Sequence, residues 1–351
     1  MKTKIIRMEE NNIDGRAIQE AGEILKSGGL VAFPTETVYG LGGDALCADS
    51  SAKIYAAKGR PSDNPLIMHI STMDALDAIV REIPKEAYLL AEKYWPGPLT
   101  MIFKKSDKVP LATTGGLDTV AVRMPSHKVA RALIEAAGGY VAAPSANRSG
   151  RPSPTVARYV VEDLDGLVDM IIDGGEVNIG LESTIIDLTG EAPMILRPGF
   201  ITEAMLKETI GKVETDKTVF DIHTKEAPKA PGMKYRHYAP GGSLTVVEGE
   251  ASRVTAYINE QLRSLRKEGK KTGVIATDET AGQYIGDSIK SAGSRGDEEA
   301  VARHLFRILR EFDDEAVEVM FAESFSGEGV GQAIMNRLLK AAGHQVISIE
   351  S

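Results

Sequence analysis

The chain has 351 residues, of which 42% are hydrophobic and 26% are charged, a balance typical of a globular protein rather than a disordered one. At this length two domains are expected rather than one. The formal net charge is −9, divided as −5 over residues 1–212 and −4 over residues 213–351. An acidic chain of this kind lacks the clustered cations on which phosphate-backbone binding depends, which argues against a nucleic-acid platform.

The start of the chain and its cysteine content bear on its compartment. The first residues, MKTKIIRMEENN, become polar and acidic too soon for a signal peptide. No run approaches the roughly 18 apolar residues that a membrane-spanning helix needs. Cys47 is the only cysteine, so no intrachain disulfide and no cysteine-based metal cluster can form. These features predict a reducing, cytoplasmic setting.

Hydrophobic periodicity predicts a first unit that mixes strands with helices. Short apolar runs bounded by Gly, Pro or Ser predict strands at 30–33, 66–70, 99–103, 119–123, 140–143, 170–173, 182–187 and 194–197. Helical spacing with capping residues predicts helices at 14–26, 51–57, 73–80, 84–94, 128–137 and 202–210.

The pattern changes after residue 212. Residues 213–243 are first charged and then rich in Pro and Gly, which excludes a regular element, yet the aromatic and cationic residues near Tyr238 are more typical of a lid than of a spacer. From residue 244 strands at 244–248, 272–276 and 317–322 alternate with helices at 252–268, 297–312 and 331–342. This alternation predicts a small parallel-sheet domain of Rossmann-like build.

Polar residues mark a first candidate site directly after the strand at 30–33. Thr35, Glu36 and Thr37 end that strand, and the glycines within 40–43 predict a loop of positive φ that lets backbone approach a ligand. Lys58 and Arg60 then lie at the turn that ends the next helix. Two cations at one turn are suited to a small anion.

Residues 144–155 form a second polar passage between a strand and a helix that Thr155 is expected to cap. Its hydroxyl, amide and backbone N–H groups suit an anion, although the same residue types also build ordinary turns. Arg123 shares a strand face with Thr119, which leaves two alternatives open, a ligand carboxylate or a surface ion pair with a helix. Spacing alone makes His69 a core histidine, and Trp95 is expected to pack over a sheet edge.

Several familiar motifs are missing. The sequence contains no GxxxxGK[ST], HExxH, CxxC or GxSxG pattern. Gly327-Glu-Gly-Val-Gly331 resembles a phosphate loop, but its spacing is not GxGxxG, so it predicts a strand–helix turn. The Lys, Arg, Ser, Asn and Thr residues at strand ends are typical of a site that positions phosphates without a covalent nucleophile.

Taken together, the polar stretches resemble a known family. The motifs are PTETVYGLG at 34–42, KGRP at 58–61, NPL at 64–66, the strand that carries Arg123, APSAN at 143–147 and APGMKYRHYAP at 230–240. In this order, and followed by a second domain, they are similar to the long, two-domain threonylcarbamoyl-AMP synthases of the YrdC/YwlC type. The resemblance covers essentially the whole chain.

The resemblance implies a fold and a reaction. The fold is α/β: a YrdC-like catalytic domain at 1–212 with a twisted, mixed, open sheet and flanking helices, a linker and lid at 213–243, and a smaller Rossmann-like parallel α/β domain at 244–351. The implied enzyme is a nucleotidyltransferase that converts ATP, L-threonine and bicarbonate into L-threonylcarbamoyladenylate and pyrophosphate, the first step of threonylcarbamoyl-adenosine modification of tRNA. Mg²⁺ is expected with ATP, and a tRNA threonylcarbamoyl-transferase is the expected downstream partner. Neither a membrane nor stable nucleic-acid binding is expected.

The same resemblance assigns the site residues. Lys58 and Arg60 are the expected catalytic residues. The residues expected to bind L-threonine are Thr37, His69, Arg123, Ala143 and Ser183. The residues expected to hold ATP are Arg60, Asn64, Thr119, Ser145, Asn147, Ser153, Arg197 and Tyr238. No residue is assigned to the metal.

Two other functions stay open. The first is an RNA-binding module without catalysis, against which the −5 charge of residues 1–212 and the lack of interleaved exposed aromatic residues argue. The second is carbamoyl transfer within a larger enzyme of the hydrogenase-maturation type. Such enzymes carry a zinc-finger segment, which a chain with one cysteine cannot build.

Overall fold

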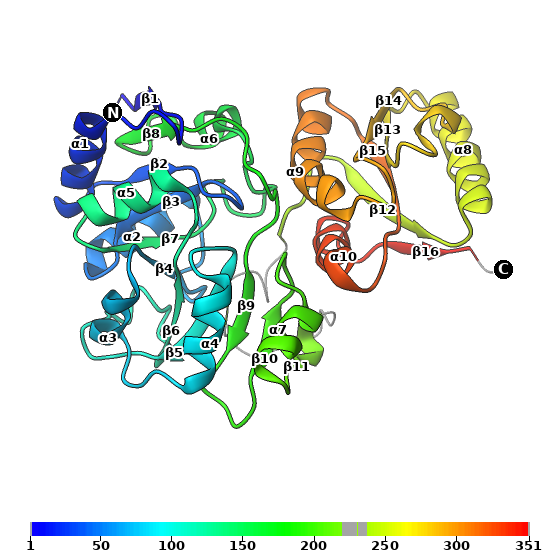
Figure 1. The fold of residues 1–351 in the computed structure, drawn as a ribbon. Coiled ribbons are helices and arrows are strands. Elements are labelled where there is room, and N and C mark those ends of the chain that lie inside the picture. The colour runs from blue at the N-terminus through cyan, green and yellow to red at the C-terminus, as the bar shows by residue number, and fades with distance from the viewer. Residues whose placement is uncertain (1, 220–229, 231–236, 350–351) are drawn as a thin grey trace. The chain divides into compact units, whose positions relative to one another are not determined.

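The structure, a computed structural model, describes residues 2–219, 230 and 237–349. The chain divides into two compact units (Figure 1). The first takes in Met1–Ser149, Ser153–Asn178 and Glu182–Tyr235, and the second takes in Gly150–Pro152, Ile179–Leu181 and Arg236–Ser351. Most of the expected linker and lid, at 220–229 and 231–236, lies outside the described residues.

The described part of the first unit is built on one eleven-stranded sheet. Its strands are β1 (Lys4–Arg7), β2 (Val31–Phe33), β3 (Gly40–Asp44), β4 (Ile67–Ile70), β5 (Leu99–Lys104), β6 (Thr119–Arg123), β7 (Tyr140–Ala143), β8 (Met170–Asp173), β9 (Thr184–Asp187), β10 (Met194–Arg197) and β11 (Glu214–Thr215). They lie in the order β1-β8-β2-β3-β7-β4-β6-β5-β9-β10-β11. Parallel neighbours such as β4 and β6 mix with antiparallel ones such as β5 and β6, which confirms the predicted mixed sheet.

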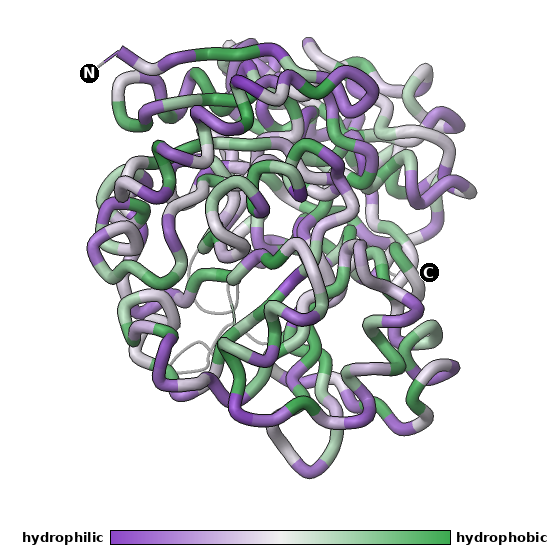
Figure 2. Tube along the Cα trace, turned by 60° about the vertical axis from the view of Figure 1, so that its left-hand side comes forward, coloured by the Kyte–Doolittle hydropathy of each residue, from purple (hydrophilic) through white to green (hydrophobic). Residues whose placement is uncertain are grey.

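Helices cover both faces of this sheet. They are α1 (Gly15–Lys26), α2 (Ala48–Lys58), α3 (Leu76–Ile79), α4 (Lys85–Tyr94), α5 (Lys128–Ala136), α6 (Ala157–Leu164) and α7 (Glu203–Ile210), with 3₁₀ turns η1 (Met73–Ala75) and η2 (Lys217–Val219). On one face α1 and α5 pack on alternate residues of β2, β7 and β8. On the other face α2, α3, α4, α6 and α7 enclose the larger core. Figure 2 shows the short alternation of hydrophobic and hydrophilic stretches that amphipathic elements require.

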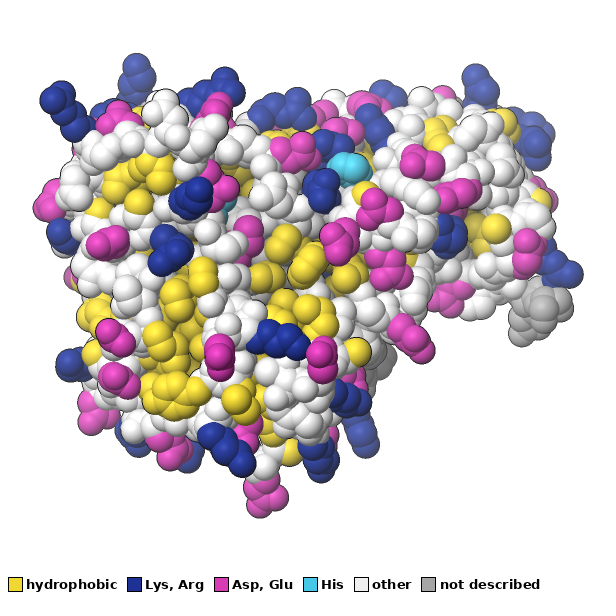
Figure 3. Space-filling view, viewed as in Figure 1, with side chains coloured by type: hydrophobic (Ala, Val, Ile, Leu, Met, Phe, Trp, Pro, Cys, Tyr) yellow, Lys and Arg dark blue, Asp and Glu magenta, His cyan; other side chains and the backbone are white. Residues whose placement is uncertain are grey.

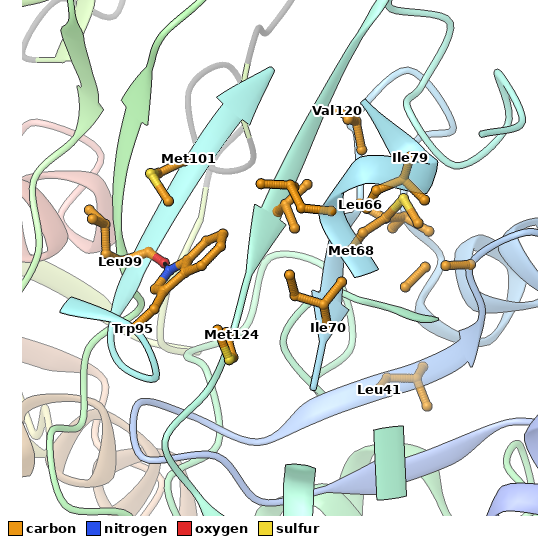
Figure 4. Packing of buried hydrophobic residues seen from close by; sticks show 14 of the residues in the cluster. Leu41, Leu66, Met68, Ile70, Ile79, Trp95, Leu99, Met101, Val120 and Met124 are labelled. Carbon is orange, nitrogen blue, oxygen red and sulfur yellow. Dashed lines mark hydrogen bonds between the residues drawn. The ribbon is translucent and has the colours of Figure 1, made fainter. Parts of the chain in front are cut away.

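The larger core takes its residues from strands of the sheet and from the helices that cover this face. Figure 4 shows Leu66, directly before β4, and Met68 and Ile70 of β4 pointing into it. Trp95 lies beside them, 7% exposed, and its Nε1 donates to the carbonyl oxygen of Leu99 at 2.7 Å. Trp95 packs on the sheet as predicted, but beside β5, an interior strand, and not over a sheet edge.

The glycines of 40–43 do not form the predicted loop. They lie in β3, pair with β2 and β7, and none has positive φ. A Cβ on Gly42 would stand 2.9 Å from Phe33 Cε1 and 2.9 Å from Val141 Cγ1. These positions therefore need glycine because neighbouring strands and side chains fill the space that a Cβ would occupy. The predicted positive φ is wrong.

A predicted helix start and a predicted helix cap are also wrong. α2 begins at Ala48 with Cys47 at the N-cap, before the start predicted at residue 51. α6 has Val156 at its N-cap with no side-chain hydrogen bond. Thr155 precedes that position, and its Oγ1 is buried without a hydrogen-bond partner among the described residues.

The described part of the second unit is a five-stranded sheet in the order β14-β13-β15-β12-β16, with every neighbouring pair parallel. Its strands are β12 (Ser243–Glu248), β13 (Thr272–Ala276), β14 (Ser288–Ser291), β15 (Val319–Glu323) and β16 (Val346–Ser348). Its helices are α8 (Ala251–Lys267), α9 (Glu298–Asp314) and α10 (Gly329–Ala341), with a 3₁₀ turn η3 (Ala281–Gln283). The predicted parallel α/β build is confirmed.

The glycine-rich passage before α10 is a strand–helix turn, as predicted. The N–H of Gly331 donates to Glu298 Oε2 at 2.8 Å, so a carboxylate of α9 already occupies the place that a phosphate would take. Throughout the described residues, no helix combines the length and the apolar character needed to span a bilayer.

Two glycines of α1 give a matched test of the packing between α1 and α5. A Cβ on Gly22 would meet the backbone of Ala136 at 2.7 Å, whereas a Cβ on Gly15 would meet nothing within 4 Å. We expect Gly22→Ala to lower the free energy of unfolding by about 1–3 kcal/mol through overpacking. Gly15→Ala should leave it unchanged or raise it by up to about 1 kcal/mol. Urea denaturation measures both, and equal effects of the two substitutions would contradict the packing described.

Candidate active site

Strands β4, β5 and β6 bring polar residues into one row across the sheet. Arg123 on β6 pairs in register with His69 on β4 and with Thr100 on β5. Residues paired in this way point to the same face, so the three side chains are neighbours. Ala143 pairs with Ile67, two residues before His69, and joins the same face.

Arg123 is held from three sides. The residue is 4% exposed; its Nη1 donates to Thr37 Oγ1 at 2.9 Å and its Nε donates to the carbonyl oxygen of Gly97 at 3.3 Å. Its Nη2 lies 2.8 Å from Glu36 Oε1. The alternative of a surface ion pair with a helix is therefore wrong, because the partner is a buried residue of the segment between β2 and β3.

Glu36 is charged in this setting. Burial raises the pKa of its carboxyl, but the positive charge of Arg123 and hydrogen bonds, one from the backbone N–H of Ser126, outweigh burial and hold the pKa below its usual value. The pair thus consists of a carboxylate and a guanidinium, both almost fully removed from water.

His69 is neutral. Burial and then the charge of Arg123 lower the pKa of its imidazole to about 3. Its Nδ1 lies 3.1 Å from the carbonyl oxygen of Ile67, and its ring meets the Phe33 ring edge to face at 6.2 Å. The residue is buried as spacing predicts, and the strand register places it beside Arg123.

A second group of contacts joins residues expected to bind different substrates. Arg197 Nη2 donates to Ser183 Oγ at 3.1 Å, and its Nε donates to the carbonyl oxygen of Ser183 at 3.0 Å. The hydroxyl of Ser183 lies 2.7 Å from that of Thr100, the neighbour of Arg123. Glu182, the residue before Ser183, accepts a hydrogen bond from Ser153 Oγ at 2.6 Å.

The loop of Ser145 to Asn147 is organised by Lys58. Lys58 is 3% exposed, and its ammonium donates to the carbonyl oxygens of Ser145 and Asn147. Ser145 Oγ donates to Asn147 Oδ1 at 2.5 Å. The backbone N–H of Ala146 donates to the carbonyl oxygen of Tyr39 at 2.7 Å, which ties this loop to the segment that carries Thr37.

The remaining expected ATP residues of the first unit lie at the opposite ends of the same strands. Thr119 begins β6, and Asn64 lies just before β4, in a turn where Arg60 donates to the carbonyl oxygens of Asn64 and Pro65 at 3.2 and 3.1 Å. Thr119 and Arg123 share a face and are four residues apart, about 13 Å at the usual rise of a strand. The two sets of residues therefore mark the two ends of one strip of sheet.

One residue of the expected linker contacts this face. Ala230 is fully buried and packs with Ile67, Ala121 and Ile185 in a small apolar cluster. Tyr238 belongs to the second unit, where it has positive φ and its ring packs on that of Phe306 at 4.9 Å between centroids.

The sequence analysis assigned no role to three members of this network, although it placed Glu36 in the first candidate site. Glu36 and Thr100 surround Arg123, and Glu182 binds Ser153. The PTET motif contained a signal for Glu36, since an acidic residue directly after a buried strand needs a cationic partner. Thr100 gave no such signal, because only the register of β5 and β6 reveals it.

Among the residues that the structure describes, no group of three or more His, Cys, Asp or Glu side chains is arranged to hold a metal ion. The described part of the site consists of cations, hydroxyls and the buried carboxylates of Glu36 and Glu182.

Two family models match the chain. One, Sua5_yciO_yrdC, described as "Telomere recombination", matches residues 23–199, and the other, described as "Threonylcarbamoyl-AMP synthase, C-terminal domain", matches residues 201–343. The chain belongs to the family of Sua5, YciO and YrdC proteins.

Within this family the chain is similar to full-length threonylcarbamoyl-AMP synthases. It is 48% identical over 347 residues to that of Pyrococcus abyssi and 46% identical over 351 residues to that of Bacillus subtilis, covering 99% of this chain and 100% of each relative. A crystal structure of P. abyssi Sua5 complexed with L-threonine superposes with a TM-score of 0.94 at 47% identity, covering 99% of this chain and 100% of that one.

The neutral state of His69 makes stability depend on pH. Since the pKa falls from 6.5 when unfolded to about 3 when folded, the unfolded chain binds the extra proton between these values, and stability is lost as the pH falls from 6.5. We expect the wild type to lose about 2 kcal/mol between pH 6.5 and 5 from this residue. His69→Gln should lack that component.

The measurement is urea denaturation at pH 8, 6.5 and 5, with His304→Gln of the second unit as the matched control. The same loss of stability in wild type and His69→Gln would contradict the neutral imidazole.

Proposed function

We propose that this protein is a threonylcarbamoyl-AMP synthase, a nucleotidyltransferase that converts ATP, L-threonine and bicarbonate into L-threonylcarbamoyladenylate and pyrophosphate, the first step of threonylcarbamoyl-adenosine modification of tRNA. The observation that carries the proposal is the buried row of Arg123, His69 and Thr100 beside Thr37. It is supported by full-length relatives of that name and by a relative solved with L-threonine.

The amino-acid end of the site is assigned to Thr37, His69, Arg123, Ala143 and Ser183. The guanidinium of Arg123 pairs with the α-carboxylate of threonine, because a buried arginine favours a charge-assisted, forked contact with a carboxylate. The neutral imidazole of His69 and the hydroxyls of Thr37 and Ser183 form hydrogen bonds with the threonine side chain without adding charge to the site.

The nucleotide end is assigned to Arg60, Asn64, Thr119, Ser145, Asn147, Ser153, Arg197 and Tyr238. Asn64 supports this assignment because its Oδ1 is buried without a hydrogen-bond partner among the described residues. Arg60 provides a phosphate contact at the turn. Lys58, bound to the carbonyl oxygens of the Ser145–Asn147 loop, acts on the triphosphate through its positive charge.

The chemistry needs two anionic groups of one molecule to be kept apart. The threonine nitrogen forms a bond to the carbon of bicarbonate, water leaves, and N-carboxythreonine results. An oxygen of the new carbamate then attacks the α-phosphorus of ATP, and the bond to the β-phosphate breaks to release pyrophosphate. Arg123 holds the α-carboxylate so that the carbamate, and not the carboxylate, meets the phosphorus.

Mg²⁺ bound with ATP would neutralise charge on the phosphates. Among the described residues no cluster of three or more His, Cys, Asp or Glu side chains would hold it, and we propose that phosphate oxygens and water would be its ligands.

We further propose three parts of the chain with distinct roles: catalysis at 1–212, a linker and lid at 213–243, and a Rossmann-like domain at 244–351. Burial of Ala230 on the site face supports a linker that returns to the site. Because the reaction consumes ATP and serves tRNA, we place the protein in the cytoplasm. A tRNA threonylcarbamoyl-transferase would accept the adenylate.

RNA binding without catalysis is the less favoured function. On the face seen in Figure 3, Lys and Arg side chains alternate with Asp and Glu instead of gathering into a basic patch. An RNA-binding surface needs such a patch, often with exposed aromatic rings for stacking.

The test is pyrophosphate release from ATP and Mg²⁺, with L-threonine and bicarbonate omitted in turn. We expect release only when both are present, because the carbamate is the nucleophile. Release with neither would indicate another nucleotidyl reaction, and no release under any condition would favour the binding module.

Two arginine variants complete the experiment. Arg60→Ala should reduce release at least about 100-fold, the loss expected for a charged contact to the reacting phosphates. Arg81→Ala, which removes an exposed ion pair with Asp107, should leave release unchanged. Wild-type turnover in Arg60→Ala would remove that residue from the phosphate contacts.

A further inference from the structure

Two buried polar atoms beside Thr37 lack an aligned partner. Arg123 Nη2 and Glu36 Oε2 have no hydrogen-bond partner among the described residues, although their residues are only 4% and 6% exposed. One atom is a donor and the other an acceptor, and both belong to the same ion pair, in which Arg123 Nη2 stands 2.8 Å from Glu36 Oε1. The pair therefore leaves one acceptor, Glu36 Oε2, without a partner, whereas the donor Arg123 Nη2 meets Glu36 Oε1 only through an ionic contact that is not aligned as a hydrogen bond.

Unused positions of this kind are rare in folded proteins. A buried charged atom without a hydrogen bond is costly, and the large majority of such atoms are satisfied. The needs of the pair itself are met through Glu36 Oε1, which faces Arg123 and accepts from the N–H of Ser126 at 3.2 Å. Glu36 Oε2 takes no part in the ion pair or in the hydrogen bond from Ser126, so its partner is expected to be a ligand.

An α-amino acid matches the two positions. It carries a carboxylate acceptor and a nitrogen donor on the same carbon, as the ion pair offers a donor and an acceptor side by side. We propose that Glu36 binds the nitrogen of the substrate, with Oε2 accepting one of its N–H groups while Arg123 binds the α-carboxylate. This inference rests on the proposed function and adds Glu36 to its amino-acid site.

The contact serves both forms of the substrate. Threonine donates from its nitrogen to Oε2, and N-carboxythreonine still has one N–H after the carbamate has formed. The same acceptor therefore fixes the rotation about the bond between nitrogen and the α-carbon. With the N–H directed at Glu36 and the carboxylate at Arg123, the carbamate oxygens point away from both charged groups.

The contact also explains selection for an α-amino acid. A carboxylic acid without the nitrogen would leave the Glu36 charge buried and unsatisfied, which a site built for a donor rejects strongly. Arg123 alone cannot make this distinction, because every carboxylate satisfies it equally.

The experiment compares two ligands in two proteins by calorimetric titration without ATP. The ligands are L-threonine and (R)-3-hydroxybutanoate, which keeps the carboxylate and the hydroxyl but lacks the nitrogen. We expect Glu36→Gln to weaken L-threonine binding about 10- to 100-fold, the worth of a hydrogen bond to a charged group. Binding of (R)-3-hydroxybutanoate should change by less than about threefold. Glu82→Gln, at an exposed ion pair with Lys104, is the matched control and should alter neither.

An equal loss of both ligands in Glu36→Gln would overturn the proposal, because Glu36 would then act only by orienting Arg123. If Glu36→Gln fails to fold, the test is made with the wild type alone. Affinities for L-threonine and (R)-3-hydroxybutanoate within threefold of each other would then overturn the proposal, because they would mean that no acceptor in the site binds the N–H groups of the substrate. If the wild type binds no L-threonine at all, the proposed function fails, and this outcome is separate from the role of Glu36.

Discussion

The ion pair of Glu36 and Arg123 is the constraint around which the first unit is arranged. Taking two charges out of water costs several kcal/mol per ion, and a buried pair rarely repays it as stability. Removing one partner lowers the free energy of unfolding by about 3–5 kcal/mol, because the other charge stays buried without a counter-charge. The surrounding donors and acceptors, Thr37, Gly97 and Ser126, make the burial tolerable. Such a pair fits the proposed binding of a ligand better than a contribution to folding stability.

The register of the central strands follows from this constraint. Arg123 reaches Glu36 and Thr37 only from its present position on β6, between His69 of β4 and Thr100 of β5. A slip of one residue would turn Arg123 into the apolar core that Figure 4 shows and turn Val122 towards the site. Because the strip of sheet continues for about 13 Å to Thr119, the same register also sets the distance between the proposed amino-acid end and the proposed nucleotide end.

Much of this could be predicted from sequence, and the failures have physical reasons. Strands such as 119–123 are short apolar runs between turn residues, so their existence was clear. The role of Gly42 was not, because a glycine that avoids Phe33 and Val141 looks in sequence like one that permits positive φ. Arg123 could equally have faced water, since alternation along a strand identifies a face without saying what covers it. The ion pair of Glu36 could be identified only from the fold, because its partner Arg123 lies 87 positions away in the sequence.

The central claim is that Arg123 holds the α-carboxylate of threonine while a carbamate derived from bicarbonate attacks the α-phosphorus. The most direct measurement is ³¹P NMR of the adenylate product made once with ¹³C-bicarbonate and once with L-threonine labelled with ¹³C at its carboxyl carbon. The account predicts a two-bond coupling between carbon and phosphorus only with labelled bicarbonate. Coupling with labelled threonine instead would mean that the carboxylate itself is adenylated, which would contradict the role of Arg123.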